Sequence, residues 1–446
     1  MPILTHEQLE DFNIPAKDPA RMRVAISHEF VEMYRGDKDI RVGEILARDY
    51  GCEIVHLGTD IASPGDSVLF GSNRYPVDKL PPLPENYYLL LQKSRLVWHR
   101  KGNMGMGGFF RLTPSIIPQL LRWKPDIIFE NPYLTLSPRS YMTYIAARKL
   151  RIPIVYLDCG DILTELKLKN RIVLPLEKRV VRRAAMVLTF NRSGERRFID
   201  KYQYPAERIR VIPKPVDTAR FSPDIPSDAF KSEFGLFGKF VVAYFGRLCT
   251  NKGAGYLLEA AEILKRRNED RDMIFLFVGG NLEAGHSAEF KRRFDRLSLD
   301  NVRMTGMISN SRMPEAYASA DIAVFPDVTN PPGFSTVLAE AMASGLPIII
   351  GNKGAETATP LVDGENGLIV AAGNPDELAD RIIRLRNDSE LLHRLASNVL
   401  KYTRREMDYK ELVKRYYEVL AEAFGAVIFG SGAIVSETKK LYSNSA

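Results

Sequence analysis

Two cations follow a strand that we predict in the second half of the chain. Gly246-Arg247 comes directly after the apolar run Phe240–Phe245, and Lys252 opens the next predicted helix. We therefore expect both side chains at the carboxyl end of a strand, the edge at which α/β domains bind ligands. Arginine offers a planar fork to phosphate oxygens, and lysine offers a compact charge. Together they could neutralise a diphosphate leaving group without a metal ion; two solvated loop charges are the alternative.

A turn that runs straight into a helix could hold the same kind of anion. Residues 332–347 read PGFSTVLAEAMASGLP, so a Gly-Phe-Ser-Thr turn leads into a segment that favours helix. Backbone N–H groups at a helix N-terminus attract a diphosphate. Glu340 lies further along this helix, where it could meet a ligand group beyond the phosphates. Taken by itself, it could equally be an ordinary surface glutamate.

These stretches resemble the donor-site signatures of the retaining glycosyltransferases of family 4, which have the GT-B fold. The resemblance extends well over residues 211–387. It implies that Arg247 and Lys252 bind the donor diphosphate and that Glu340 hydrogen-bonds the donor ribose. The other residues that it places around the donor are Gly246, Gly280, Met307, Ile308, Gly333, Phe334, Ser335 and Thr336.

One position departs from the family pattern. Eight positions before Glu340, where relatives have a Glu that contacts the donor sugar, this chain has Pro332. Proline offers neither a side-chain acceptor nor a backbone N–H. Either the sugar is held differently, through Asp327 or Asn330, or transfer is weakened or lost.

The first half of the chain offers weaker candidates. His28 follows the first predicted strand, although a lone histidine is more often structural. Gly36 is the one glycine that matches a glycine-rich loop found there in relatives. Asp158 and Asp161 follow a predicted strand at a place where relatives often carry a histidine.

Two other patterns fail on inspection. Gly280–Ser287 comes close to a phosphate-binding loop, but His286 stands where that loop needs lysine. Asp270-Arg271-Asp272 has the letters of a metal motif, yet it precedes a strand, away from the ligand edge. We expect no metal and no cofactor, with a nucleotide-diphosphate sugar as co-substrate.

Composition sets broader limits. The chain has 446 residues, 45% of them hydrophobic and 26% charged, which suits two or three globular domains. A net charge of +7 fits an anionic ligand, an anionic membrane surface or an ordinary basic surface. No recognised motif favours nucleic acid. Lys178, Arg179, Arg182 and Arg183 fall largely on one face of a predicted helix, which could dock on anionic lipid or simply be solvated.

Cysteine usage and the N-terminus predict a location. Cys52, Cys159 and Cys249 lie far apart, with no paired spacing of a zinc site, which favours free thiols in a reducing compartment. Met1–Arg23 has no apolar core of signal-peptide length. The sequence has no apolar run that approaches the roughly 18 residues of a membrane span. We expect a cytoplasmic protein, with peripheral attachment to the inner membrane face as an option.

Alternating apolar and amphipathic runs predict an α/β fold. The alternation breaks at the proline-rich residues 213–238 and then restarts, as in a GT-B fold with two doubly wound, Rossmann-like domains that face a central cleft. We predict an acceptor-side domain over residues 1–214, with an insertion at about 60–118, a nucleotide-sugar domain over 215–405, a helix over 406–424 that returns to the first domain, and a flexible tail over 425–446.

The resulting prediction is a glycosyltransferase that moves a sugar from a nucleotide-diphosphate sugar to an acceptor hydroxyl, with retention and without metal. Glycan or glycolipid biosynthesis would be its setting, and carbohydrate, lipid-linked and protein acceptors all remain open. Pro332 motivates one alternative, a nucleotide-sugar-binding pseudoenzyme. Another GT-B activity, such as a phosphorylase or an epimerase, is the second.

Overall fold

The computed structural model divides into two compact units. Unit 1 is built from Met1–Ile212 together with Lys410–Ala446, and unit 2 from Pro213–Tyr409. The sequence-based boundaries fall after residues 214 and 405, close to these divisions. The structure describes residues 3–27, 38–60, 82–99, 109–131, 138–158, 167–249, 252–280, 284–297, 299–328, 335–352 and 359–429.

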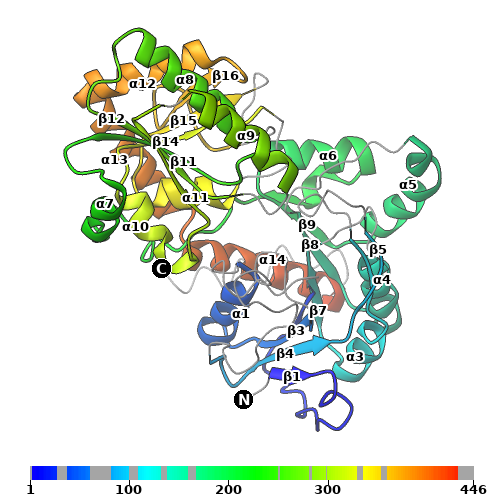
Figure 1. Cartoon of the computed structure of the whole chain (residues 1–446). Coiled ribbons are helices and arrows are strands. Elements are labelled where there is room, and N and C mark those ends of the chain that lie inside the picture. Colours follow the sequence, from blue (N-terminus) through cyan, green and yellow to red (C-terminus); the bar gives the residue numbers. More distant parts are fainter. Residues whose placement is uncertain are drawn as a thin grey trace. The chain divides into compact units, whose positions relative to one another are not determined.

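The described part of unit 1 contains an eight-stranded parallel sheet with the order β1-β4-β3-β2-β7-β8-β9-β10 (Figure 1). From β2 the chain first winds to one side and then, from β7 on, to the other, as in a doubly wound domain. Its strands are β1 (Ile3–Thr5), β2 (Arg23–Ser27), β3 (Glu53–Thr59), β4 (Tyr87–Gln92), β7 (Ile127–Glu130), β8 (Ile154–Asp158), β9 (Met186–Thr189) and β10 (Ile209–Val211).

Helices cover both faces of this sheet, because its strands are apolar on both sides. On one face Val55 and Tyr156 belong to a buried cluster with Trp123. On the other face Ile26 and Tyr87 approach the helix that carries Gly43. The helices are α1 (Lys38–Asp49), α3 (Ile116–Trp123), α4 (Pro138–Leu150), α5 (Lys167–Val181), α6 (Arg192–Tyr202) and α14 (Tyr409–Phe429).

The final helix, α14, packs on unit 1. The ring of Tyr416 lies 6.0 Å from that of Phe129, and Tyr417 stacks on Tyr50 at 4.4 Å between centroids. Residues 425–429, which the sequence assigns to a flexible tail, continue this helix to Phe429. The rest of that tail lies outside the described residues.

The predicted insertion at about residues 60–118 needs correction. Strand β4 pairs in parallel with β3, from Ile54↔Tyr87 to Thr59↔Gln92, and with β1 on its other side. It is therefore a strand of the main sheet. The strand is only six residues long, and without a recognisable helix before it the sequence does not reveal the crossover. Beyond β4, the antiparallel pair β5 (Arg95–His99) and β6 (Phe109–Leu112) departs from the α/β pattern.

The described part of unit 2 holds a six-stranded parallel sheet with the order β13-β12-β11-β14-β15-β16 (Figure 1). Its strands are β11 (Phe240–Phe245), β12 (Met273–Val278), β13 (Val302–Gly306), β14 (Ile322–Phe325), β15 (Ile348–Asn352) and β16 (Leu368–Ala371). Its helices are α7 (Asp228–Phe234), α8 (Ala254–Arg266), α9 (Ala284–Leu297), α10 (Met313–Ala318), α11 (Thr336–Ala343), α12 (Pro375–Asn387) and α13 (Ser389–Glu406).

Two doubly wound α/β units confirm the predicted fold class, while a cleft between them stays a prediction. The chain of unit 2 starts at the central strand β11 and reverses direction between β13 and β14, so a topological switch point lies beside β11. The carboxyl ends of β11, β12, β13 and β14 meet at one edge of the sheet. That edge positions the candidate site.

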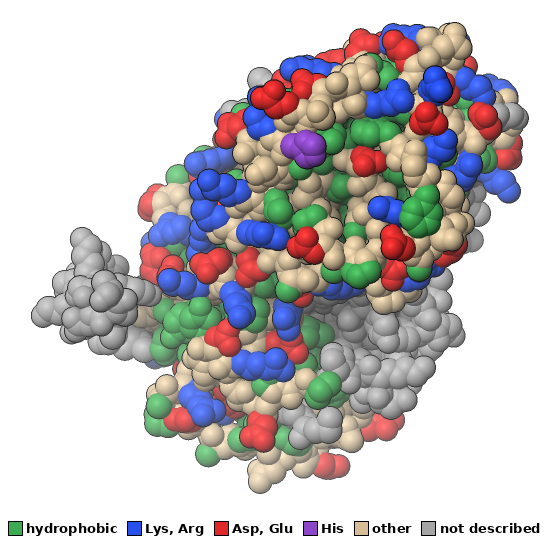
Figure 2. All heavy atoms as spheres, turned by 90° about the vertical axis from the view of Figure 1, so that its left-hand side faces the viewer, with side chains coloured by type: hydrophobic (Ala, Val, Ile, Leu, Met, Phe, Trp, Pro, Cys, Tyr) green, Lys and Arg blue, Asp and Glu red, His purple; other side chains and the backbone are tan. Residues whose placement is uncertain are grey.

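Charged side chains of both signs are interspersed over the face shown in Figure 2. Independently of that view, the ion pairs of unit 2 include Arg267 with Asp376 and Asp380, and Lys265 with Asp300. The basic residues on the face in Figure 2 therefore do not form one continuous positive patch. None of the helices in the described ranges has the length and apolar character that crossing a bilayer requires.

Candidate functional site

The turn after β11 holds Arg247 at the ligand edge of unit 2. Gly246 adopts φ 144°, a value that favours glycine, and its N–H donates to the carbonyl oxygen of Val278 at 3.0 Å. The Tyr244 hydroxyl donates to the carbonyl oxygen of Arg247 at 2.6 Å. Burial raises the pKa of Tyr244 well above its usual value, so the hydroxyl keeps its proton. The backbone of Arg247 is thus fixed, while its side chain is half-buried.

Glycines let three neighbouring strand ends touch. A Cβ on Gly279, where φ is 135°, would lie 2.1 Å from the carbonyl oxygen of Gly246. A Cβ on Gly280 would lie 2.8 Å from Cγ of Met307. Met307 is 50% exposed and Ile308 is half-buried. The structure therefore brings together four of the residues predicted at the nucleotide, and their role stays a prediction.

Lys252 lies beside the end of β14. Its ammonium Nζ is 2.6 Å from Oδ2 of Asp327, with the two side chains 28% and 13% exposed. The next residue, Gly253, has φ 72°, and a Cβ there would lie 1.8 Å from the carbonyl oxygen of Pro326. The backbones on either side of the ion pair are thus in direct contact. Arg247 and Lys252 lie on one connected turn, because the Cys249 N–H donates to Arg247 O and the Lys252 N–H donates to Cys249 O.

Helix α11 begins with a side-chain cap. Oγ of Ser335 accepts the N–H of Leu338 at 3.3 Å, and Thr336 is exposed at the first helical position. The first turn of the helix has no acidic residue, so none of its own side chains neutralises the partial positive charge at the helix N-terminus. Gly333 and Phe334, the other predicted residues of this turn, lie outside the described residues.

Glu340 is only 6% exposed, and a tyrosine from another helix holds it. The Tyr317 hydroxyl on α10 donates to Oε2 of Glu340 at 2.9 Å. The ring of Tyr317 packs 4.1 Å from that of Phe245, the last residue of β11. Burial, and then the charge of Glu340, raise the pKa of Tyr317 well above its usual value, so the phenol remains a donor. Sequence analysis missed Tyr317, because helical periodicity does not show what it faces.

The first test concerns this tyrosine. Tyr317→Phe removes the donor that orients Glu340, and we expect KM for the nucleotide sugar to rise about three- to tenfold, as for a hydrogen bond worth about 0.5–1.5 kcal/mol. Steady-state kinetics measures it. Tyr204→Phe is the matched control, since that buried hydroxyl donates to Ala184 O at 3.0 Å in unit 1. An equal effect of both variants on KM would contradict a role for Tyr317 in the site.

Cys249 lies inside the turn between the two cations, and it is buried. Burial raises the pKa of its thiol, Asp327 raises it further, and Arg247 and Lys252 lower it in part. The thiol therefore stays protonated and fills space at the base of the turn. Cys52 is also buried, and its pKa rises to about 12.

Several candidates cannot be placed. His28, Gly36, Asp161, Asn330 and also Pro332 lie outside the described residues. Asp158, at the end of β8, is 4% exposed, pairs with Arg197 and accepts a hydrogen bond from Thr189 Oγ1 at 3.4 Å. Its carboxylate therefore has structural partners in α6 and at the end of β9. Among the described residues, no three His, Cys, Asp or Glu side chains are grouped so that they could hold a metal ion.

The predicted basic helix face is partly engaged within the protein. Arg182 donates to the carbonyl oxygen of Tyr202 at 3.0 Å and also to Gln203. Arg179 and Arg183 are exposed. These contacts give Arg182 a structural role, and docking on lipid stays a prediction.

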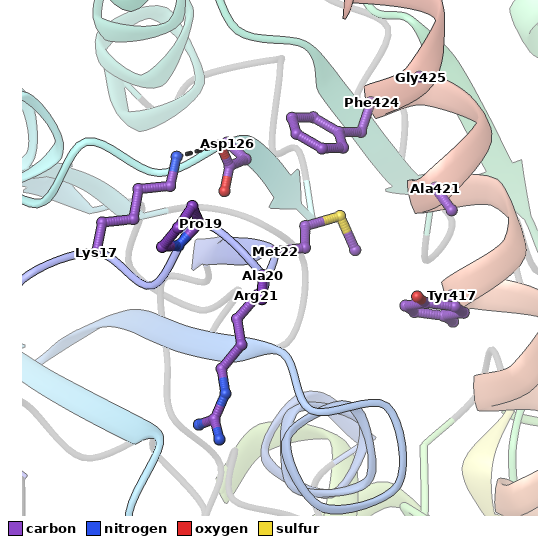
Figure 3. A pocket seen from close by; sticks show the side chains of 10 residues that line it. All are labelled: Lys17, Pro19, Ala20, Arg21, Met22, Asp126, Tyr417, Ala421, Phe424 and Gly425. Atoms are coloured by element: carbon purple, nitrogen blue, oxygen red, sulfur yellow. Dashed lines mark hydrogen bonds and ion pairs between the residues drawn. The ribbon is translucent and has the colours of Figure 1, made fainter.

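Unit 1 contains a cavity of about 510 Å³ at the edge of its sheet where strands β2 and β7 begin (Figure 3). Met22 and Asp126, in its wall, directly precede β2 and β7, so the cavity opens at the amino ends of these strands. Asp126 pairs with Lys17 and accepts the N–H of Arg23 at 2.8 Å. None of the predicted site residues that fall within the described ranges lines it. The lining residues are Lys17, Pro19, Ala20, Arg21, Met22, Asp126, Tyr417, Ala421, Phe424 and Gly425.

Comparison with known families matches both halves of the chain. A family described as "Glycosyl transferases group 1" matches residues 239–388, and one described as "Glycosyltransferase Family 4" matches residues 71–220. Together the two matches cover most of the sheet of unit 1 and the whole sheet of unit 2.

Several curated relatives carry the names of glycosyltransferases. Alpha-D-kanosaminyltransferase of Streptomyces kanamyceticus is 28% identical over 270 residues, which are 58% of this chain and 68% of the relative. A GDP-mannose-dependent alpha-(1-6)-phosphatidylinositol monomannoside mannosyltransferase of Mycobacterium tuberculosis is 30% identical over 228 residues, which are 49% of this chain and 58% of the relative. The chain thus spans between about half and two thirds of the length of such relatives.

Solved structures share the fold at low identity. Anabaena HepE in complex with UDP aligns with a TM-score of 0.68 and 19% identity, over 90% of this chain and all of that one. Sucrose-phosphate synthase from Thermosynechococcus elongatus aligns with a TM-score of 0.64 and 17% identity, over 91% of this chain and 100% of that one. With both halves matched by family and the fold shared along the chain, this protein belongs to the group 1, or family 4, glycosyltransferases of the GT-B fold.

Proposed function

We propose that this protein transfers a glycosyl group from a nucleotide-diphosphate sugar to an acceptor hydroxyl. The observation that carries the proposal is the turn after β11, where hydrogen bonds and glycine contacts hold Arg247 and Lys252 at the ligand edge of unit 2. Two cations at one strand end suit a diphosphate better than a neutral ligand. The relatives agree with this chemistry, since one is named as GDP-mannose-dependent and HepE was solved with UDP-glucose.

In the proposed reaction the bond between the anomeric carbon and the diphosphate oxygen breaks, and a bond between that carbon and the acceptor oxygen forms. The acceptor proton passes to the departing diphosphate. Arg247 and Lys252 stabilise the charge that develops on this leaving group, and Glu340 positions the ribose. Attack from the leaving-group face would retain the anomeric configuration without a protein nucleophile.

We propose that the two cations take the place of a divalent metal at the diphosphate. Transfer should then persist in EDTA at the rate seen with added Mg²⁺. A rate that falls with EDTA and returns with Mg²⁺ would contradict this part of the proposal.

The experiment that tests the function is a panel of UDP- and GDP-sugars with carbohydrate, lipid-linked and protein acceptors. Release of nucleoside diphosphate that depends on an acceptor is the expected result. Binding of a nucleotide sugar without turnover on the whole panel would instead favour the pseudoenzyme that Pro332 suggests. Interconversion of the sugar nucleotide, or a requirement for free phosphate, would indicate an epimerase or a phosphorylase.

A further inference from the structure

Lys252 and Asp327 form an ion pair that the proposed chemistry does not by itself require. Their charged atoms are 2.6 Å apart, and both side chains are more than two-thirds buried. A cation assigned to a diphosphate thus already has an anionic partner in the protein. A diphosphate that binds Lys252 would therefore lie close to the carboxylate of Asp327, which has the same sign of charge.

The pair is built into the backbone. Gly253 follows Lys252 and touches the carbonyl oxygen of Pro326, which precedes Asp327. On the other side, a Cβ on Gly351 in β15 would lie 2.9 Å from the carbonyl oxygen of Asp327. The backbone of Asp327 is thus held between the turn that carries Lys252 and the end of β15, which keeps the two residues of the pair side by side.

The charge of Asp327 also reaches the rest of the site. Its carboxylate raises the pKa of both Tyr244 and Cys249, whereas Arg247 lowers the pKa of the same two groups. In both groups burial is the largest cause of the raised pKa. Arg247, Lys252 and Asp327 therefore act on one small region at the end of β11.

We propose that Asp327 is a positioning residue that shares the Lys252 ammonium with the donor and makes the site prefer the nucleotide sugar over the free nucleoside diphosphate. The inference rests on the proposed function. In a nucleotide sugar the outer phosphate carries one negative charge, because the sugar esterifies it. In the free diphosphate the outer phosphate approaches two charges at neutral pH, since its second pKa is about 6.

A fixed carboxylate beside Lys252 repels the extra charge of the free diphosphate more than it repels the esterified donor. The sugar also brings hydroxyl groups, which can donate to a carboxylate, whereas a terminal phosphate brings acceptors. Both effects favour release of the spent nucleotide after transfer. Asp327 would thus limit product inhibition while it keeps Lys252 in place for the donor.

The test compares two affinities in one variant. Calorimetry with UDP, UDP-glucose, GDP and GDP-mannose identifies the nucleotide that the wild-type protein binds. For that nucleotide, we expect Asp327→Asn to bind the free diphosphate about three- to tenfold more tightly and the nucleotide sugar no more tightly. The inhibition constant of the released diphosphate should fall in parallel, while Asp327→Glu should keep most of the wild-type ratio.

Asp272→Asn is the matched control, because Asp272 pairs with Lys239 at 2.9 Å, at the amino ends of β12 and β11 in the same unit. It should leave both affinities unchanged. If Asp327 has a purely structural role, Asp327→Asn should weaken the binding of the free diphosphate and of the nucleotide sugar by the same factor. An unchanged ratio of the two affinities would overturn the inference, while the proposed function would stand. Wild-type protein that binds none of the four nucleotides would overturn the proposed function, and the inference with it.

Discussion

Arg247→Ala and Lys252→Ala should each lower kcat/KM for the nucleotide sugar by about ten- to a hundredfold, because a hydrogen bond to a charged group contributes roughly 1.5–3 kcal/mol. Lys252→Ala should be the more severe of the two. It also leaves the carboxylate of Asp327, which is 13% exposed, beside the diphosphate without the cation that pairs with it here. Initial rates over a range of donor concentrations measure both effects.

Two further variants sharpen this test. Lys239→Ala removes an ion-paired lysine at the other edge of the same sheet and should leave kcat/KM unchanged. The double variant with Lys252→Ala and Asp327→Ala should recover part of the activity lost in Lys252→Ala, because it removes the repulsive charge as well. Wild-type kinetics in both Arg247→Ala and Lys252→Ala would refute the diphosphate assignment.

Gly253→Ala should destabilise unit 2 and abolish tight donor binding. The added methyl group would lie 1.8 Å from the carbonyl oxygen of Pro326, and the backbone at φ 72° disfavours any residue with a Cβ. Relief of the overlap must separate the turn that carries Lys252 from the strand end that carries Asp327. Urea denaturation and calorimetry with the nucleotide measure the two losses.

Gly235→Ala separates the two causes. Gly235 has a similar φ of 66°, but nothing lies within 4 Å of a Cβ there. It should cost only the conformational penalty of about 1–2 kcal/mol. We expect Gly253→Ala to lower the free energy of unfolding by about 2 kcal/mol more than this control, the scale of a buried steric overlap. An equal loss of unfolding free energy in Gly253→Ala and Gly235→Ala would mean that the turn with Gly253 can move away from Pro326 without cost.

Much of unit 2 could be predicted from its sequence. Strand β11 has the bounds of the apolar run Phe240–Phe245 that predicts it, strands β12 and β14 coincide with similar runs, and helix α11 lies in the segment 332–347 that favours helix. Each strand is a continuous apolar run, as expected of a parallel sheet covered on both faces. Helix α11 is bounded by the capping Ser335 and by Gly345, which has φ 71°. In unit 1, by contrast, β4 was misassigned, because its run is short and its crossover has no clear period.

The site was predictable in its parts but not in its contacts. Sequence position alone predicted that Arg247 and Lys252 follow the same strand, because strand ends can be located from periodicity. The pairing of Lys252 with Asp327 depends on a close approach between Gly253 and Pro326, which lie far apart in the sequence. The hydrogen bond from Tyr317 to Glu340 likewise depends on how two helices face each other. Local patterns do not contain that information.

The return of the last helix to unit 1 sets an order for folding during synthesis. Residues 213–409 form one continuous stretch, so unit 2 can complete its core as soon as it leaves the ribosome. Unit 1 leaves first but cannot cover Phe129 until Tyr416 has been made. Its nascent sheet must therefore wait through the translation of the whole of unit 2 with the part of one apolar face around Phe129 uncovered by α14.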